Sequence, residues 1–340
     1  MRGICLSAIL VAIFCSSASA GRIVAEIQGD SYWSRDDLYG YSWYSREYGA
    51  HRPYVDGNVR PVREDVSAAL YIRNSLEYKV IVSKIYRNAL RELFSLPMGS
   101  EHTAMLEQTG KSGLSRLPAA VVMSVDQVVL DTALPLSILL GRGYFINPYI
   151  LPRRIAVMDN LPPLPGAVNF IRSAQSKGIR IVFMSDRVCL SRSSNPCPQQ
   201  DALIRNLRRL GIRAYRENVL LAGSRSPWGA NKISRRKFIS RNYHVLLQIS
   251  SSLYDFMPLP MLINARRSGS ITDFVPHAIL DRWVLLPNPF YGDWHHYEKL
   301  KWCGSRSIRS FYCLADGLSG KLSRYSLSDD RDDNFFDQEY

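Results

Sequence analysis

Short apolar segments alternate with amphipathic ones from residue 119 onward, and this alternation constrains the fold more than any other feature of the sequence. The apolar segments are 119–123, 180–184, 218–221, 244–249 and 282–286. The segments with helical periodicity between them are 165–176, 199–210 and 232–241, and the first two are followed by Gly178 and Gly211. This order predicts βαβ units, and therefore an α/β fold with a parallel sheet covered by helices on both faces.

The part of the chain before this alternation contains three kinds of segment. Residues 1–20 combine Arg2, an apolar run and the letters SSASA, which is the pattern of a cleaved secretory signal peptide. Residues 21–65 are rich in Tyr and Gly without a sustained period, which indicates an irregular arm. Residues 68–96 are expected to form one helix, because apolar side chains recur there at steps of three and four: Leu70, Ile72, Leu76, Val80, Ile81 and Ile85.

These segments set the expected domains and the expected compartment. The signal peptide predicts an exported protein, either periplasmic, at the cell surface or secreted. One domain is expected over residues 66–300, with its core strands from about 118 to 290, followed by a C-terminal segment, 301–340, that ends in an acidic tail. No later run reaches about 18 uncharged apolar residues, so we expect no transmembrane segment.

Four of the six cysteines remain once residues 1–20 are removed: Cys189, Cys197, Cys303 and Cys313. An even number of cysteines in an exported chain is consistent with two disulfides, and local pairing is the simplest of the three possible connectivities. Free buried thiols are the alternative. Zinc is disfavoured, because no histidine lies close to a suitable pair of cysteines.

The chain is strongly basic, with a formal charge of +13, of which the signal peptide contributes only Arg2, so that +13 less 1 leaves +12. Much of the excess lies in residues 205–216 and 232–241. We interpret these stretches as solvated helix faces, or as faces that attract small anions or the cell envelope. Specific nucleic-acid binding is not expected, because no aromatic-interleaved RNA-binding pattern is visible.

Ligands of parallel α/β sheets bind outside the carboxyl ends of the strands, which directs attention to four segments. Their sequences are SVD at 124–126, SDR at 185–187, SSSLYD at 250–255 and LPNPFYGDW at 286–294. Ser124 and Asp126 are expected to point the same way, because side chains alternate along a strand. Asp186 and Arg187 are interpreted as a local ion pair at the end of their strand.

These strand ends, in this order, resemble those of the secreted class B/C acid phosphatases, 5′-nucleotidase-like members of the haloacid dehalogenase (HAD) superfamily. The resemblance runs from about Leu70 to Trp294 and is carried by 120–122 with Asp126, 130–131, 165–167, 182–187, 231–232 with Arg235, Leu253 with 255–256, and LPNPFYGDW. It implies an HAD-like Rossmannoid sheet with a small helical cap or N-terminal helical region. It also implies Mg²⁺-dependent hydrolysis of phosphomonoesters.

The chain departs from the family pattern in the centre of the expected chemistry. Ser124 stands where the family has its nucleophilic aspartate, while Asp126 keeps the position of the general acid. The family's Mg²⁺ takes carboxylates at the positions of Ser124 and Ser251 and a backbone carbonyl at the position of Asp126. With Asp126, Ser251 and Asp255 as the remaining metal-site positions, we expect Mg²⁺ binding to be weak or absent.

Three functional hypotheses follow from this resemblance and its departures. The first is an exported acid phosphatase-like protein with impaired catalysis and a cleft that binds phosphate or a nucleoside monophosphate through Ser185 and Lys232. The second is an active acid phosphatase or 5′-nucleotidase with an altered site, using Ser124 or a different metal arrangement. The third is an envelope or host-surface interaction protein in which the pocket is vestigial.

Overall fold

The computed structural model describes residues 63–97, 100–141, 153–190, 195–229, 231–290 and 292–294. The chain divides into two compact units, Met1–Gly292 and Asp293–Tyr340, and the sheet with its covering helices belongs to the first. The expected signal peptide, residues 21–62 of the arm, Cys303, Cys313 and the acidic tail lie outside the described residues. Within the described part of the chain, no helix is long and apolar enough to cross a membrane.

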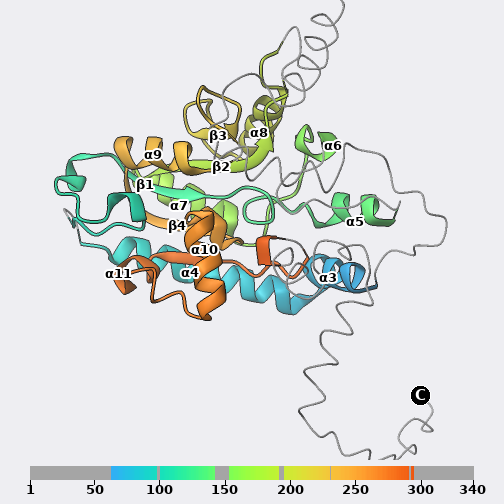
Figure 1. The fold of residues 1–340 in the computed structure, drawn as a ribbon. Coiled ribbons are helices and arrows are strands. Elements are labelled where there is room, and N and C mark those ends of the chain that lie inside the picture. Colours follow the sequence, from blue (N-terminus) through green and yellow to red (C-terminus); the bar gives the residue numbers. More distant parts are fainter. Residues whose placement is uncertain are drawn as a thin grey trace, which may run out of the picture. The chain divides into compact units, whose positions relative to one another are not determined.

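The core is a five-stranded sheet in the order β3-β2-β1-β4-β5, and all of its neighbouring strands are parallel (Figure 1). The strands are β1 (Ala119–Met123), β2 (Arg180–Val188), β3 (Val219–Ala222), β4 (His244–Ser250) and β5 (Trp283–Leu285). In the centre of the sheet Val121 pairs with Ile181 on one side and with Leu247 on the other. The predicted parallel α/β sheet is therefore confirmed.

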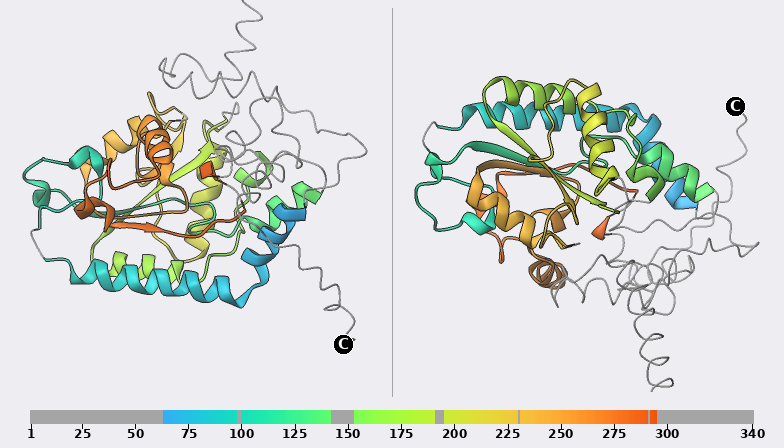
Figure 2. Two further views of the ribbon diagram at one scale, coloured as in Figure 1. Left: turned by 60° about the horizontal axis from the view of Figure 1, so that its bottom comes forward. Right: turned by 90° about the horizontal axis from the view of Figure 1, so that it is seen from above.

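Helices cover both faces of this sheet (Figure 2). On one face lie α4 (Leu76–Ser95), α7 (Ala167–Ser176) and α8 (Pro198–Arg209), and on the other lie α9 (Ile233–Asn242) and α10 (Leu259–Ser268). Alternate strand residues serve the two faces, as the pleat requires. Val121 and Met123 belong to the core under α4 and α7, whereas Ala120 and Val122 belong to the core that contains Ile239 of α9.

Several short elements surround this core. They are α3 (Arg63–Asn74), α5 (Ala133–Gly141), α6 (Arg153–Ala156), α11 (His277–Leu280), and the 3₁₀ turns η1 (Leu106–Gln108), η2 (Leu114–Arg116) and η3 (Leu253–Asp255). Helix α3 packs against α5, and α6 packs against α8. Because α5 and α6 follow the end of β1, they supply helical structure next to the carboxyl edge of the sheet.

The single helix expected over residues 68–96 is two helices, α3 and α4, separated at Ser75. The Ser75 hydroxyl accepts a hydrogen bond from the backbone N–H of Tyr78 at 3.1 Å and donates one to the carbonyl of Tyr71 at 2.7 Å. A serine in extended conformation that accepts from the third residue onward is an N-cap. The apolar period continues through this position, which is why the break was not predicted.

The apolar side chains that indicated this helix are mostly not the ones it buries. Leu76 is 72% exposed and Val80 is 51% exposed. The buried stripe of α4 consists of Tyr78, Val82, Tyr86, Ala89 and Leu93. Tyr86 is fixed there by its hydroxyl, which donates to the carbonyl of Val128 at 2.7 Å. Helix α4 thus stabilises the segment that follows β1.

The strand order makes the boundary between β1 and β4 the topological switch point of the sheet. From β1 the chain proceeds outward through β2 and β3 on one side, and it then returns to form β4 and β5 on the other. The direction of winding therefore reverses between β1 and β4. In open α/β sheets such a reversal marks the usual ligand position, at the carboxyl ends of the two strands. The ends of β1 and β4 are Met123 and Ser250.

Candidate functional site

The segment after β1 is held in a fixed conformation that positions Ser124 and Asp126. The backbone N–H of Ser124 donates to the carbonyl of Ile249 at 2.9 Å and so continues the pairing of β1 with β4. Gln127 is fully buried and has φ of +56°, a left-handed conformation that is uncommon for residues other than glycine. Its side-chain amide accepts from the N–H of Thr132 at 3.2 Å and donates to the hydroxyl of Tyr78 at 3.3 Å.

Three side chains meet directly between the ends of β1 and β4. The hydroxyls of Ser124 and Ser250 both donate to one oxygen of Asp255, Oδ2. The two hydroxyl oxygens are themselves 2.9 Å apart. Ser124 is half-buried, whereas Ser250 and Asp255 are 1% and 4% exposed. Ser124, which the sequence resemblance places at the nucleophile's position, is therefore a hydroxyl donor to the acidic residue that follows β4.

Lys232 completes this group from the start of α9. Its side chain is 2% exposed, and its ammonium contacts Oδ1 of Asp255 and, at 2.8 Å, Oδ1 of Asp186. Burial alone would lower the pKa of Lys232, but the two carboxylates outweigh it and raise the pKa above its ordinary value. Burial likewise tends to raise the pKa of Asp255, yet Lys232 and the two serine hydroxyls lower it overall. Both groups are consequently ionised at neutral pH.

A second ion pair fixes Asp126, the residue expected from the sequence in the position of the general acid. Arg187 is fully buried and binds both oxygens of this carboxylate, through Nη2 at 2.8 Å and Nε at 3.1 Å. Its remaining Nη1 donates to the carbonyl of Ala156 at 3.1 Å. This is a bidentate pair, the most specific geometry between guanidinium and carboxylate.

The expected local pair between Asp186 and Arg187 is wrong. Adjacent residues of a strand point to opposite sides, and this alternation separates the two side chains. Asp186 contacts Lys232, whereas Arg187 contacts Asp126. Each charged residue at the end of β2 thus has a partner from another element.

Ser185 is a buried neighbour of Asp126. It is 2% exposed, and its hydroxyl donates to Oδ2 of Asp126 at 3.4 Å while accepting from the N–H of Arg187 at 3.1 Å. Arg235 of α9 donates from Nη1 to the carbonyl of Ser185 at 2.7 Å. Ser185 therefore connects the end of β2 with both Asp126 and α9.

Most of the site residues expected from the sequence thus lie at one edge of the sheet. Ser124, Lys232 and Asp255 form one bonded group, while Asp126 and Ser185 form a second around Arg187. Ser251 joins neither group: it is half-buried, and its hydroxyl has no hydrogen-bond partner among the described residues. The serine that contacts Ser124 is its neighbour Ser250.

Sequence reasoning missed Ser250 and Asp186 as members of these groups, and it assigned the wrong partner to Arg187. Ser250 belongs to a run of three serines, and only the pleat decides which of them faces β1. Asp186 stands beside the predicted phosphate ligand Ser185 in the sequence. Its position after a strand was a usable signal, but its contact with Lys232 spans 46 residues and has no local pattern.

The side chains present do not fit Mg²⁺, which the resemblance implies. Magnesium prefers anionic oxygen ligands in octahedral arrangement. Both expected carboxylate positions carry hydroxyls, at Ser124 and Ser251. The oxygens of Asp126 already accept from Arg187, and those of Asp255 accept from Lys232 and the serines. A divalent ion would have to displace a buried cation from either acid.

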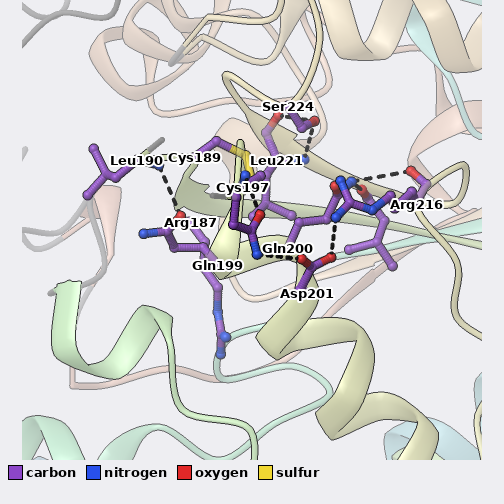
Figure 3. Close-up of a disulfide and its surroundings, with 12 residues drawn as sticks. Arg187, Cys189, Leu190, Cys197, Gln199, Gln200, Asp201, Arg216, Leu221 and Ser224 are labelled. Atoms are coloured by element: carbon purple, nitrogen blue, oxygen red, sulfur yellow. Dashed lines mark hydrogen bonds and ion pairs between the residues drawn. A yellow bond between two sulfur atoms is a disulfide. The ribbon is translucent and has the colours of Figure 1, made fainter. Parts of the chain in front are cut away.

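A disulfide lies beside this edge of the sheet and joins the end of β2 to the start of α8 (Figure 3). Cys189 and Cys197 form it, so the local pairing expected for these two cysteines is confirmed. The N–H of Cys189 donates to the carbonyl of Ala222 at 2.8 Å, and that of Leu190 donates to the side chain of Gln199 at 3.0 Å. The segment that follows Arg187 is thereby attached to β3 and α8.

The two basic stretches of the sequence differ in the structure. In 205–216 the arginines make contacts with nearby groups, such as the ion pair of Arg216 with Asp201 at 2.6 Å (Figure 3). In 232–241 the expected solvated face is wrong for three residues, because Lys232, Arg235 and Arg236 are all buried. The charged groups of these three side chains lie inside the protein or at the edge of the sheet that carries the site, and not in solvent.

Comparisons with known proteins agree with this fold. The family model described as HAD superfamily, subfamily IIIB (Acid phosphatase), matches residues 103–294, more than half of the 340 residues. The class C acid phosphatase from Bacillus anthracis with tungstate bound is 21% identical, with a TM-score of 0.56 and coverage of 78% of this chain and 98% of that chain.

Another structure of the class C acid phosphatase from Bacillus anthracis is also 21% identical, with a TM-score of 0.55 and coverage of 79% of this chain and 98% of that one. The comparison with curated proteins gave no match. At this identity the solved structures establish the fold, and the family model establishes the family. The chain belongs to subfamily IIIB of the HAD superfamily, the acid phosphatases.

Proposed function

We propose that this member of the acid phosphatase family is an exported protein that binds phosphate, or a nucleoside monophosphate-like anion, without hydrolysing it by the family's mechanism. The observation that carries the proposal is the bond from the hydroxyl of Ser124 to Asp255, at the position expected for a nucleophilic carboxylate. Export is supported by the signal-peptide pattern of residues 1–20 and by the disulfide between Cys189 and Cys197.

Loss of turnover is supported by two separate features of the site. Removing the nucleophile from an integrated active site typically lowers the rate by on the order of 10⁴ to 10⁶. The donor set also does not fit the metal that would stabilise charge on a transferring phosphoryl group. Because Lys232 lowers the pKa of Asp255, this carboxylate is a weak base for the hydroxyl of Ser124.

Anion binding is supported by the groups that remain. The side chain of Asp186 is 41% exposed, and it is the partner of Lys232 that can turn toward solvent. A phosphate oxygen can then replace it on the ammonium, while another accepts from the hydroxyl of Ser124 once that hydroxyl has left Asp255. Ser185 is the second proposed phosphate contact, and its hydroxyl has to leave Asp126 to reach the anion.

Phosphate-dependent thermal stabilisation tests this proposal. Inorganic phosphate and a nucleoside monophosphate should raise the Tm of the wild type at matched ionic strength, whereas chloride should not. Lys232→Gln should abolish the response, and Lys237→Gln, an exposed lysine of the same helix, should retain it. If no phosphate compound shifts the Tm of the wild type, the pocket is vestigial, and the envelope or host-surface interaction hypothesis takes precedence.

A second candidate function is favoured by the same hydrogen bond. As a phosphoryl acceptor, the oxygen of Ser124 would form a bond to phosphorus as the ester P–O bond breaks. Its proton would pass to Asp255, and the departing alkoxide would take a proton from water. Mass spectrometry after incubation with an aryl phosphate detects the resulting phosphoserine. Its presence in the wild type and absence in Ser124→Ala would establish this alternative.

A further inference from the structure

Helix α4 carries a second apolar stripe that the fold does not bury. Leu76, Val80 and Phe94 are 72%, 51% and 45% exposed. On a helix of 3.6 residues per turn these three positions fall within about 40° of one another. The other stripe, which includes Tyr78 and Val82, packs into the core. Figure 2 shows α4 along the outside of the first unit, where α7 lies against it.

Basic side chains lie between these apolar ones on the same side of the helix. Lys84, Arg87 and Arg91 are exposed and come between Val80 and Phe94 in the sequence. Within the described residues, none of the three cations is in an ion pair. Together these side chains span about a quarter of the helix circumference. They form the outer face of α4, which consists of Leu76, Val80, Lys84, Arg87, Arg91 and Phe94.

We propose that the outer face of α4 docks on the surface of an anionic phospholipid bilayer. The helix would lie in the plane of the membrane, with its three apolar side chains between the head groups and the acyl chains. The three cations of the same face would contact the lipid phosphates. This surface goes beyond the proposed phosphate-binding pocket and uses none of the residues of that pocket.

Charge and apolar surface together favour a lipid partner. A helix with apolar side chains and Lys or Arg on its exposed side is typical of proteins that lie on anionic membranes. Each Lys or Arg near such a membrane strengthens binding by about fivefold. Among the residues of α4, all of which the structure describes, Glu77 is the only exposed acid. The outer face therefore complements a negatively charged surface along its length, which is about 30 Å for 20 residues.

Two other occupants would fit the outer face less well. A second copy of the chain would present the same patch, and so would bring two sets of Lys84, Arg87 and Arg91 into one interface. Residues 21–62 of the same chain contain five arginines and six acidic residues, so they offer almost no net charge to complement the cations. A lipid surface accommodates both the apolar and the cationic members of the face.

Sedimentation with vesicles tests the proposal on the chain without residues 1–20, whose apolar run would itself bind lipid. Anionic vesicles contain equal parts of phosphatidylcholine and phosphatidylglycerol, and neutral vesicles contain phosphatidylcholine alone. The variants are Leu76→Gln/Val80→Gln and Lys84→Gln/Arg87→Gln/Arg91→Gln. The matched control, which removes three exposed cations of another surface, is Arg205→Gln/Arg209→Gln/Arg216→Gln.

The wild type should bind anionic vesicles, bind neutral ones far more weakly, and be released by high salt. The cation variant should bind on the order of 100-fold more weakly, and the apolar variant at least about tenfold more weakly. The control should bind like the wild type. Added inorganic phosphate at constant ionic strength should not compete, which separates this surface from the proposed pocket. The substituted side chains are exposed, so the Tm of each variant should stay close to that of the wild type.

Three results would overturn the proposal. The first is a wild type that does not bind anionic vesicles, and the second is binding that both α4 variants retain or that the control loses equally. The third is evidence for another occupant of the outer face. A dimer in analytical ultracentrifugation that Leu76→Gln/Val80→Gln dissociates would identify a second copy. Vesicle binding that appears only after deletion of residues 21–62 would identify that segment.

Discussion

The ion pairs at the site and those along α8 use the same residue types in opposite surroundings. Arg187 and Asp126 have side chains 0% and 11% exposed, and Lys232 and Asp255 have side chains 2% and 6% exposed. Asp201 of α8 and its partner Arg216, which follows that helix, have side chains 24% and 49% exposed. Water solvates the α8 charges in the folded and unfolded states alike, whereas the site charges lose their water on folding.

This contrast shows what holds the site in its present form. An exposed pair contributes little, because hydration and Coulomb attraction nearly cancel. A buried pair need not stabilise the fold, but removing one member leaves the other without compensation. Asp126 and Asp255 are therefore each paired with a buried cation, Arg187 and Lys232, whose removal would leave the carboxylate without compensation.

The largest expected effect is that of Arg187→Met. This variant leaves the carboxylate of Asp126 and the carbonyl of Ala156 without their buried donors, and it should lower the free energy of unfolding by about 3–5 kcal/mol. Chemical denaturation by urea measures the loss. A loss below about 1 kcal/mol would mean that the site pair behaves like the α8 pair, and the comparison would fail.

The next effect is the dependence of stability on acid. Because the pKa of Asp255 is lower in the folded state, its contribution is present above the unfolded value of about 3.9 and is lost as the pH falls through the folded value. Urea denaturation should therefore show stability falling below about pH 4. Asp159 contributes to the same loss of stability at low pH, since hydrogen bonds from Arg205 and Arg209 lower its pKa too.

Asp255→Asn isolates the contribution of Asp255. Its free energy of unfolding should fall less steeply below about pH 4 than that of the wild type. Lys232 affects stability at high pH. Because its pKa is raised in the folded state, its contribution to the free energy of unfolding is present below about pH 10.4 and is lost as the pH rises through the folded value. Stability that rose on acidification of the wild type from pH 5 to pH 3 would be inconsistent with this assignment.

A smaller effect is expected at Asp186, the partly exposed member of the site. Asp186→Asn removes the carboxylate that competes with an anion for Lys232, and it should tighten phosphate binding roughly tenfold. Isothermal titration of both proteins with inorganic phosphate measures the change. Unchanged or weaker binding would show that phosphate does not approach Lys232 from the side of Asp186.

The smallest effect is expected from the exposed pair. Arg216→Gln should change the free energy of unfolding by less than about 1 kcal/mol, because the side chains of Arg216 and Asp201 keep much of their hydration. It is the matched counterpart of Arg187→Met in the same denaturation experiment. A loss comparable to that of Arg187→Met would remove the distinction between buried and exposed pairs.

Much of the fold could be predicted because each strand can be recognised from a short stretch of sequence. The run AAVVM at 119–123 and the other apolar segments are short, uninterrupted and bounded by polar residues, so that they coincide closely with β1 to β5. The face of α4 could not be found in this way. Its sequence has two apolar stripes, and the large side chains of Tyr78 and Tyr86, with their hydroxyl bonds, decide which one is buried.

The site could be predicted in its position but not in its bonding. The residues after β1, β2 and β4 were found because strand ends of a parallel sheet meet at one edge. Which side chain faces which depends on the pleat and on contacts across many residues, as for Lys232 with Asp186 and Ser250 with Ser124. Short-range sequence patterns do not predict those contacts.

Turnover of an aryl phosphate by the wild type in the presence of Mg²⁺, measured beside Ser124→Ala, decides whether this chain hydrolyses phosphomonoesters. If Ser124 occupies the place of a lost nucleophile and the site holds no metal, the two proteins should give the same rate, at the level of buffer. Wild-type turnover that depends on Mg²⁺ and disappears in Ser124→Ala would contradict the account.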